Sequence, residues 1–273
     1  MNSLATYDLL QSLQMLALAV GLPALLLAET LWPSRAGRTL GGRAVHLRRN
    51  GGLWLVTSLA TSIVFGSGLV YAAYWLEVHR VGVLNLAGAP AWLSIVVGVL
   101  ALDFADYAFH RMSHEIRWLW LLHAVHHSDD DVDVTTNLHA HPLHVLATGV
   151  TKIVVLAAIG IPLWVWLLRE LVTMPVTQFH HAAIRLPARV ERLLGVFVVT
   201  PAMHRVHHST EPGENNTNFG GLVPWWDRLL RTYADPRTRA VAAFGLPALR
   251  EARFHTVLGM CATPFAARRL RAL

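Results

Sequence analysis

Long apolar runs without charged residues constrain this chain more than any other feature. Residues 9–28 carry no charged side chain, residues 51–76 form a second such run, and residues 91–102 form a third. A helix of about 20 apolar residues crosses the roughly 30 Å of hydrocarbon in a bilayer. Only 15% of the residues are charged, whereas about a quarter are charged in soluble domains. We therefore expect an all-α integral membrane protein rather than an ordinary soluble enzyme.

A fourth apolar run, residues 145–168, is interrupted by Lys152 and by the sequence Gly160-Ile161-Pro162. Glycine and proline commonly end helices, so we expect a helical membrane hairpin near residues 145–175. The expected fold has about four transmembrane helices, or hairpin equivalents, and a helical histidine-rich cap.

Arginines predict the orientation and the organisation of the chain. Residues 33–50 carry five arginines, whereas residues 77–90 carry Arg80 alone. Because basic loops stay in the cytoplasm, we expect a cytoplasmic cap on a bacterial inner membrane. We divide the chain into membrane helices (1–102), a histidine-rich region (103–235) and a cytoplasmic tail (236–273), which form one integrated domain. The arginines flank apolar runs instead of forming patches, so nucleic-acid binding is not expected.

Histidine is the second unusual feature, because 13 of the 16 histidines lie between residues 110 and 208. They form an HxxxH motif at 110–114 and HxxHH motifs at 123–127 and 204–208. On a helix, side chains three or four residues apart share a face. Such a density of imidazoles predicts a metal site, since unpartnered buried polar groups are costly. Cys261 is the single cysteine, so imidazole and carboxylate are the expected ligands, and these leave the choice of metal open.

Spacing alone leaves several functions open: a metal-dependent enzyme, a non-enzymatic membrane protein that binds or transports metal, a pH sensor and a zinc hydrolase. A metal carrier would place ionisable residues along its spans, and the first two apolar runs contain none. One catalytic zinc needs fewer histidines. The chain contains neither HExxH nor GxSxG, which excludes the common zinc-protease helix and the serine nucleophile elbow.

The histidine motifs resemble those of the fatty acid hydroxylase/sterol desaturase superfamily of membrane di-iron oxygenases. The similarity runs from about residue 103 to residue 233, through DFADYAFHRMSHE, WLWLLHAVHHSDDDVDVTTN and PAMHRVHHSTEPGENNTNFGGLVPWWDRLLRTY. HPLH at 141–144 and FHHAAIRLP at 179–187 lie between these segments. The resemblance implies an oxidoreductase with two iron ions, which uses dioxygen to hydroxylate or desaturate a C–H bond of a fatty acyl chain, a sterol or a related lipid.

The resemblance also implies roles for individual residues. The iron ligands that it implies are His110, His114, His123, His126, His127, His181, His204, His207 and His208. Asp103, His141 and His180 are expected to contact the ligands without binding iron themselves. Asp106 and Glu115 are the candidate catalytic residues. Asp103 and Asp106 precede His110 by about two turns and one turn, and such carboxylates often hold the outer N–H of a ligand imidazole. His139 and His144 replace an arginine and a glutamate that are common in the superfamily, which leaves the substrate open.

Electrons have to reach this site from outside the chain. The sequence has no GxGxxG fingerprint, no CxxCH haem site and no set of iron–sulfur cysteines. We expect NAD(P)H-derived electrons to arrive through a separate ferredoxin, cytochrome or reductase. The lipid and the membrane are the other expected partners, and the oligomeric state stays open.

Overall fold

The computed structural model describes residues 3–35, 37–66, 68–211, 213–239 and 241–266, and these residues are predominantly helical. Within them no strand forms, and one isolated β-bridge joins Pro33 to Ile184. The expected all-α fold is confirmed. The α-helices are α1 (Ser3–Leu31), α2 (Leu40–Val64), α3 (Gly68–Val78), α4 (Val83–Leu86), α5 (Ala91–Glu115), α6 (Arg117–His127), α7 (Pro142–Ile159), α8 (Leu163–His181), α9 (Ala188–Phe197), α10 (Pro201–His207), α11 (Trp225–Leu229) and α12 (Val257–Ala266). Short 3₁₀ helices are η1 (Val134–Leu138), η2 (Pro236–Thr238), η3 (Pro247–Leu249) and η4 (Ala252–His255).

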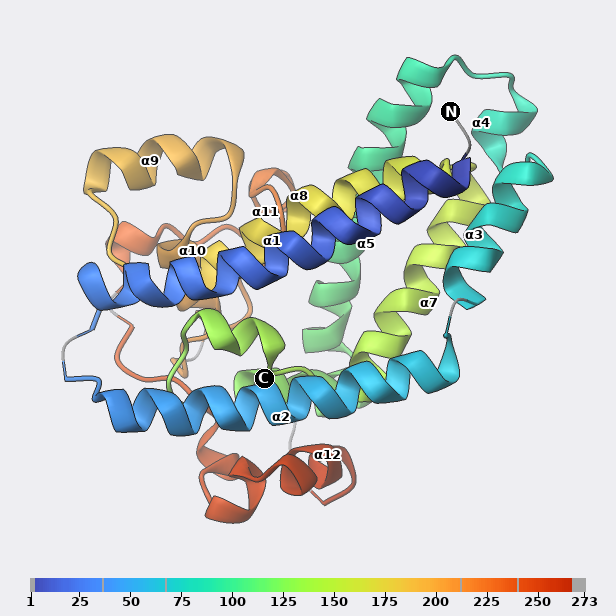
Figure 1. The fold of residues 1–273 in the computed structure, drawn as a ribbon. Coiled ribbons are helices and arrows are strands. Elements are labelled where there is room, and N and C mark those ends of the chain that lie inside the picture. The colour runs from blue at the N-terminus through green and yellow to red at the C-terminus, as the bar shows by residue number, and fades with distance from the viewer. Residues whose placement is uncertain (1–2, 36, 67, 212, 240, 267–273) are drawn as a thin grey trace.

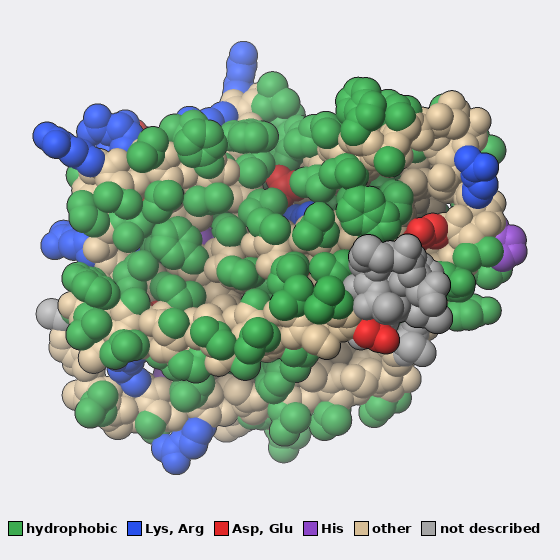
Figure 2. Space-filling view, turned by 45° about the horizontal axis from the view of Figure 1, so that its top comes forward, with side chains coloured by type: hydrophobic (Ala, Val, Ile, Leu, Met, Phe, Trp, Pro, Cys, Tyr) green, Lys and Arg blue, Asp and Glu red, His purple; other side chains and the backbone are tan. Residues whose placement is uncertain are grey.

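Three helices are long and apolar enough to cross a membrane: Asp8–Leu31 of α1, and α5 and α7 in full. Helix α2 and the segment Gly68–Leu86 form a fourth candidate span, which is bent by 48°. The expected number of spans is therefore confirmed, and the chain is a multi-pass membrane protein. The surface agrees with these spans: in Figure 2, hydrophobic side chains are spread over much of the face shown.

The second apolar run, residues 51–76, is divided between α2 and α3. Helices α2 and α3 meet at Gly66, whose φ of 48° favours glycine over residues with a side chain. Helix α2 also begins within the arginine-rich segment, because the Thr39 side chain caps its first turn by accepting a hydrogen bond from the Gly42 N–H. The segment 33–50 is therefore only partly a loop, and its helical arginines are Arg43, Arg48 and Arg49.

The hairpin expected near residues 145–175 forms from α7 and α8. Gly160 ends α7 with a φ of 84°, and Pro162 immediately precedes α8. Both helices pack with α5 around a core that includes Leu102, Leu156 and Trp166. The boundary that we placed after residue 102 therefore lies inside α5, and the spans share this core with the histidine-rich region.

Two other contacts enclose the histidine-rich region. Helix α1 runs along α8, as Figure 1 shows. They approach closely at Gly21, where a Cβ atom would lie 2.5 Å from Oε1 of Gln178. On the other side the C-terminal segment covers α6, where Trp120 packs with Leu249 and Phe254. Residues 267–273 of the expected tail lie outside the described residues.

Candidate metal centre

Histidines from α5, α6, α8 and α10 converge because these helices pack against one another. Helix α5 ends at Glu115, and α6 begins two residues later and packs against α5. Helix α10 starts behind Thr200, whose side chain accepts a hydrogen bond from the Met203 N–H, and it has proline at its first position. Helix α8 packs against both α5 and α10. The motifs 110–114, 123–127 and 204–208, together with the end of α8, therefore meet in one region.

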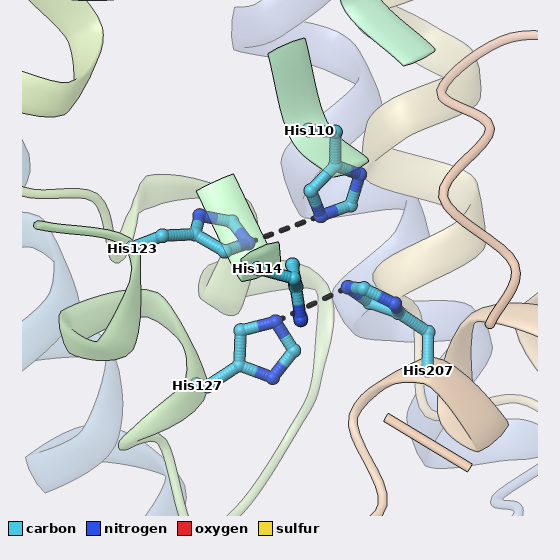
Figure 3. A group of neighbouring side chains, drawn as sticks. All are labelled: His110, His114, His123, His127 and His207. Atoms are coloured by element: carbon cyan, nitrogen blue, oxygen red, sulfur yellow. Dashed lines mark hydrogen bonds between the residues drawn. The ribbon is translucent and has the colours of Figure 1, made fainter. Parts of the chain in front are cut away.

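The five-histidine group consists of His110, His114, His123, His127 and His207. One nitrogen atom from each ring lies within 4.8 Å of those from the others. Figure 3 shows the five rings arranged around a common centre. Nε2 of His110 lies 3.0 Å from Nε2 of His123, and Nε2 of His127 lies 3.1 Å from Nε2 of His207.

The four-histidine group consists of His126, His181, His204 and His208. It adjoins the five-histidine group, since the stacked rings of His127 and His208 have centroids 4.5 Å apart. Each HxxHH motif supplies both groups. Its first and last histidines, four residues apart on one helix face, belong to one group, and the histidine between them belongs to the other. The spacing of this motif thus brings two clusters together.

Backbone carbonyl groups fix the protonation of several rings. Nδ1 of His110 lies 2.8 Å from the carbonyl oxygen of Phe219, and Nδ1 of His207 lies 2.8 Å from that of Thr217. A carbonyl oxygen only accepts hydrogen bonds, so these Nδ1 atoms carry the proton and leave the Nε2 lone pair directed into the group. His126 and His181 are held in the same way by the carbonyl oxygens of His139 and Thr177.

Burial keeps the histidines neutral. In the segments outside the candidate spans, burial is the largest effect, and it lowers the pKa of each ring below its usual value, with neighbouring histidines lowering most of these pKa values further. The rings with this lowered pKa are His123, His126, His127, His204, His207 and His208. Neutral imidazoles keep their lone pairs available to a metal at neutral pH.

The facing nitrogen atoms fit a bound cation. Nε2 of His126 and Nε2 of His181 lie 3.2 Å apart. In each of these neutral rings the single N–H, at Nδ1, donates to a carbonyl oxygen, so neither Nε2 carries a proton. Two lone pairs at this distance repel each other unless a cation lies between them. His114 is fully buried, and its Nε2 atom has no hydrogen-bond partner in the part of the chain that the structure describes. The residues of both groups therefore suit a metal ion bound through imidazole.

A cavity of about 370 Å³ opens beside both groups, and we call it the histidine cavity. Phe109, Met174 and Phe219 supply apolar wall, and Asp106, Lys152 and Glu170 supply charge. The candidate ligands that line it come from both groups and are His110, His123, His126, His181 and His204. A molecule in this cavity would reach both groups at once.

The carboxylates that we expected to act on the ligands pair with basic side chains instead. Asp103 and Asp106 form ion pairs with Arg169, and within the described residues neither holds the outer N–H of a ligand imidazole. The outer nitrogen of His110, Nδ1, is held by the Phe219 carbonyl oxygen. The side chain of Glu115 is 55% exposed and pairs with Arg111, one turn back on α5. Within the described residues, Glu115 makes no hydrogen bond or ion pair with a histidine. Asp106 does line the cavity.

The nine histidines that we expected as ligands are the members of the two groups, and their role as ligands stays a prediction. His180, expected behind the ligands, lines the cavity, and its ring centroid lies 4.0 Å from that of His204. His141 caps α7 by accepting a hydrogen bond from the Leu143 N–H, and its Nε2 lies 3.1 Å from the carbonyl oxygen of Cys261. His141 thus links α7 to α12.

Sequence reasoning missed a buried network behind the four-histidine group, and this network includes His46. Nε2 and Nδ1 of His46 lie 2.7 Å and 3.1 Å from carboxylate oxygens of Asp129 and Asp133. Carboxylates only accept hydrogen bonds, so the ring carries both protons and a positive charge. The same region contains Arg38 and Arg49, which pair with these two carboxylates. We call Arg38, His46, Arg49, Asp129 and Asp133 the loop cluster.

The loop cluster anchors the segment that holds a candidate ligand. Asn50, one turn after His46, accepts at Oδ1 a hydrogen bond from Nδ1 of His139, at 2.7 Å. The carbonyl oxygen of His139 in turn orients His126. The side chains of His46, Asp131 and Asp133 also lie close enough to hold a metal ion. However, Arg35 and Arg38 already pair with these carboxylates, so the positive charge that they require is present.

Comparisons with known proteins agree with the histidine motifs. Residues 95–232, just over half of the chain, match the family described as fatty acid hydroxylase. The chain is 28% identical over 215 residues to ornithine lipid hydroxylase OlsE of Rhizobium tropici, which covers 76% of this chain and 61% of that protein. It is 30% identical over 189 residues to alkylglycerol monooxygenase of Homo sapiens, which covers 68% of this chain and 40% of that protein.

A third relative is the cholesterol 25-hydroxylase-like protein 1, member 2 of Danio rerio. It is 31% identical over 158 residues, which cover 55% of this chain and 55% of that protein. The chain thus spans less than two thirds of the length of each of these curated relatives. No solved structure matches the chain.

Proposed function

The chain belongs to the fatty acid hydroxylase family, and we propose that it hydroxylates a C–H bond of a membrane lipid with dioxygen and two iron ions. The observation that carries this proposal is a cavity that reaches both histidine groups. An aliphatic C–H bond offers no acidic proton, so its oxidation needs a redox cofactor. By their names, the relatives given above are an ornithine lipid hydroxylase, an alkylglycerol monooxygenase and a cholesterol 25-hydroxylase-like protein.

We assign one iron ion to the five-histidine group and one to the four-histidine group. Bound iron supplies the redox chemistry, which is the reduction of dioxygen and the oxidation of the C–H bond. The chain supplies position: the carbonyl oxygens of Phe219, Thr217, His139 and Thr177 hold the outer ring nitrogens and aim the inner ones. Apolar walls of the cavity exclude water from the bond that reacts.

The net reaction consumes one C–H bond, one dioxygen molecule, two electrons and two protons, and it yields one alcohol and one water molecule. The sequence carries no motif for a flavin, a haem or an iron–sulfur cluster. We therefore assign the electrons to NAD(P)H through a separate ferredoxin, cytochrome or reductase. Removal of a second hydrogen atom would give an alkene instead, and the names of the relatives favour the alcohol.

We assign the histidine-rich region to the cytoplasmic side. The arginines of residues 33–50, against Arg80 alone in residues 77–90, support this orientation. Arg38 and Arg49 from this segment contact the loop that follows α6. The segment and the histidine groups therefore lie on the same side of the membrane.

Metal analysis and oxygen uptake by the purified full chain test this function. We expect two iron ions per chain, and oxygen uptake that depends on a lipid and on reduced carrier. His126→Ala and His181→Ala should remove metal and lower turnover by more than the roughly 100-fold that loss of an outer hydrogen-bond partner costs. His180→Ala should retain both ions, since His180 belongs to neither group.

His79→Ala is the matched control, because His79 is exposed and stacks on Trp75 at the end of α3. It should keep full metal content and turnover. Stoichiometric metal binding without lipid-dependent oxygen uptake would contradict the proposal and favour a metal carrier.

A further inference from the structure

Five charged side chains meet where α5, α7 and α8 pack together, and we call them the cavity cluster: Asp103, Asp106, Lys152, Arg169 and Glu170. Nη1 of Arg169 pairs with Asp106 and Glu170, and Nη2 pairs with Asp103. Lys152 Nζ lies 2.8 Å from Oε1 of Glu170. Helices α5 and α7 are candidate spans. Ionisable residues inside spans are costly, and they commonly mark a path or a site for a polar ligand.

The cavity cluster has an inner and an outer half. Arg169 and Asp103 are buried, and both oxygens of Asp103 are bonded, one to Arg169 and the other to the indole N–H of Trp226. The outer half lines the histidine cavity. It consists of Asp106, Lys152 and Glu170, whose side chains are 20%, 13% and 26% exposed. The charged end of the cavity is thus open to a ligand.

Two carboxylate oxygens in the outer half lack a partner among the described residues. The basic side chains all bind Oδ2 of Asp106 and Oε1 of Glu170. Oδ1 of Asp106 and Oε2 of Glu170 therefore remain free to accept hydrogen bonds. Three carboxylates also face only two basic side chains, which leaves the cluster with one excess negative charge. Free acceptors and excess negative charge together match a cationic donor.

We propose that Asp106 and Glu170 bind an ammonium group of the lipid substrate. This inference rests on the proposed function and adds the substrate class: a membrane lipid with an amine in its polar part. A neutral lipid with hydroxyl groups could donate hydrogen bonds to the same oxygens, but it would leave the excess charge uncompensated. The amine-bearing lipid is therefore the favoured occupant.

The position of the cavity cluster also limits where the lipid is oxidised. Asp106 lies four residues before His110 on α5, which corresponds to a rise of about 6 Å along the helix. An ammonium group bound at Asp106 therefore places carbon atoms only a few bonds away beside the histidine groups. We expect the hydroxyl group to enter near the polar part of the lipid, far from the end of an acyl chain.

Binding and turnover of three probe lipids test this assignment on the full-length protein in detergent. The probes are ornithine lipid, the same lipid with its amine acetylated, and an alkylglycerol. We expect wild-type protein to bind ornithine lipid at least about tenfold more tightly than the acetylated form, as for loss of a charge-assisted hydrogen bond. Mass spectrometry of the product locates the hydroxyl group.

Two variants assign the binding to the cluster. Asp106→Asn and Glu170→Gln should raise Kd and KM for ornithine lipid about tenfold, and should leave those for the acetylated lipid unchanged. Asp235→Asn and Glu251→Gln make the same chemical changes in ion pairs outside the cavity, and both should behave as wild type. The wild-type comparison of the lipids needs no variant, so it decides the matter even if a variant fails to fold.

Equal binding of ornithine lipid and its acetylated form, or tighter binding of alkylglycerol, would overturn the inference. Turnover of alkylglycerol without turnover of ornithine lipid would also overturn the inference, and it would leave the proposed function standing. Tight binding of ornithine lipid without oxygen uptake by iron-loaded protein would instead refute the proposed function and leave the ammonium site standing.

Discussion

The loop cluster and the cavity cluster are built from the same kinds of side chain, yet their pairing differs. In the loop cluster every carboxylate oxygen of Asp129 and Asp133 is bonded, to His46, to arginines or to neighbouring backbone and side-chain donors. In the cavity cluster Asp106 and Glu170 each keep one oxygen that no other described residue bonds. The loop cluster lines none of the described cavities, whereas the cavity cluster forms one end of the histidine cavity.

This difference separates two uses of buried charge. Charges that satisfy one another completely hold protein segments in place, since removing one partner strands the others. Charges that leave acceptors open beside a cavity keep capacity for a ligand. We therefore expect the loop cluster to determine stability and the geometry of His126, and the cavity cluster to determine which lipid binds.

The largest expected effect comes from Asp129→Ala in the loop cluster. It removes the buried carboxylate that pairs with Arg49 and with Nε2 of His46, which should lower the free energy of unfolding by about 3–5 kcal/mol. Metal bound by the four-histidine group should also fall, because the loop supplies the carbonyl oxygen that orients His126. Denaturant unfolding and metal analysis in detergent measure both effects.

Asp106→Ala is the matching variant in the cavity cluster. We expect it to lower the free energy of unfolding by less than about 1 kcal/mol, because Arg169 keeps its pairs with Asp103 and Glu170. Equal losses in the two variants would remove the distinction between the clusters.

A smaller effect is expected from pH, through Asp133. Burial opposes ionisation of this carboxyl group, but the hydrogen bond from His46 and the charges of His46 and Arg38 lower its pKa to about 2. The folded pKa lies below the unfolded value of about 3.9, so its contribution to stability is complete above that value. The contribution is lost as the pH falls from about 4 to 2.

The stability difference between wild type and Asp133→Asn should therefore shrink by about 1 kcal/mol between pH 5 and pH 3. Denaturant unfolding at the two pH values measures it, and the exposed Glu251→Gln variant controls for general acid effects. A difference that does not change with pH would show that Asp133 acts through packing alone.

Local patterns predicted much of this molecule from sequence. The apolar runs gave the spans, Gly160 and Pro162 gave the hairpin, and the HxxHH spacing placed rings on shared helix faces. Resemblance, not spacing, selected His181. Neither source indicated the loop cluster, because His46 and Asp129 are 83 residues apart. The bend at Gly66 was missed because an apolar composition does not report the direction of a helix.

The cavity cluster was missed for the same reason. Lys152 was visible only as an interruption of an apolar run, and Asp106 only as a neighbour of His110. Their pairing with Glu170 depends on how α5, α7 and α8 pack. Contacts between side chains on three helices have no periodicity that a sequence displays.

The smallest expected effect distinguishes binding from packing within the cavity cluster. Lys152 and Arg169 are the two cations of the cluster that pair with Oε1 of Glu170. If the cluster only holds helices together, Lys152→Met should weaken every lipid equally through local loosening. If the cluster binds an ammonium group, removing this competing charge raises the excess negative charge, while Oε1 of Glu170 keeps its pair with Nη1 of Arg169. The KM for ornithine lipid should then fall a few-fold while that of its acetylated form stays constant, and a rise in both would favour packing.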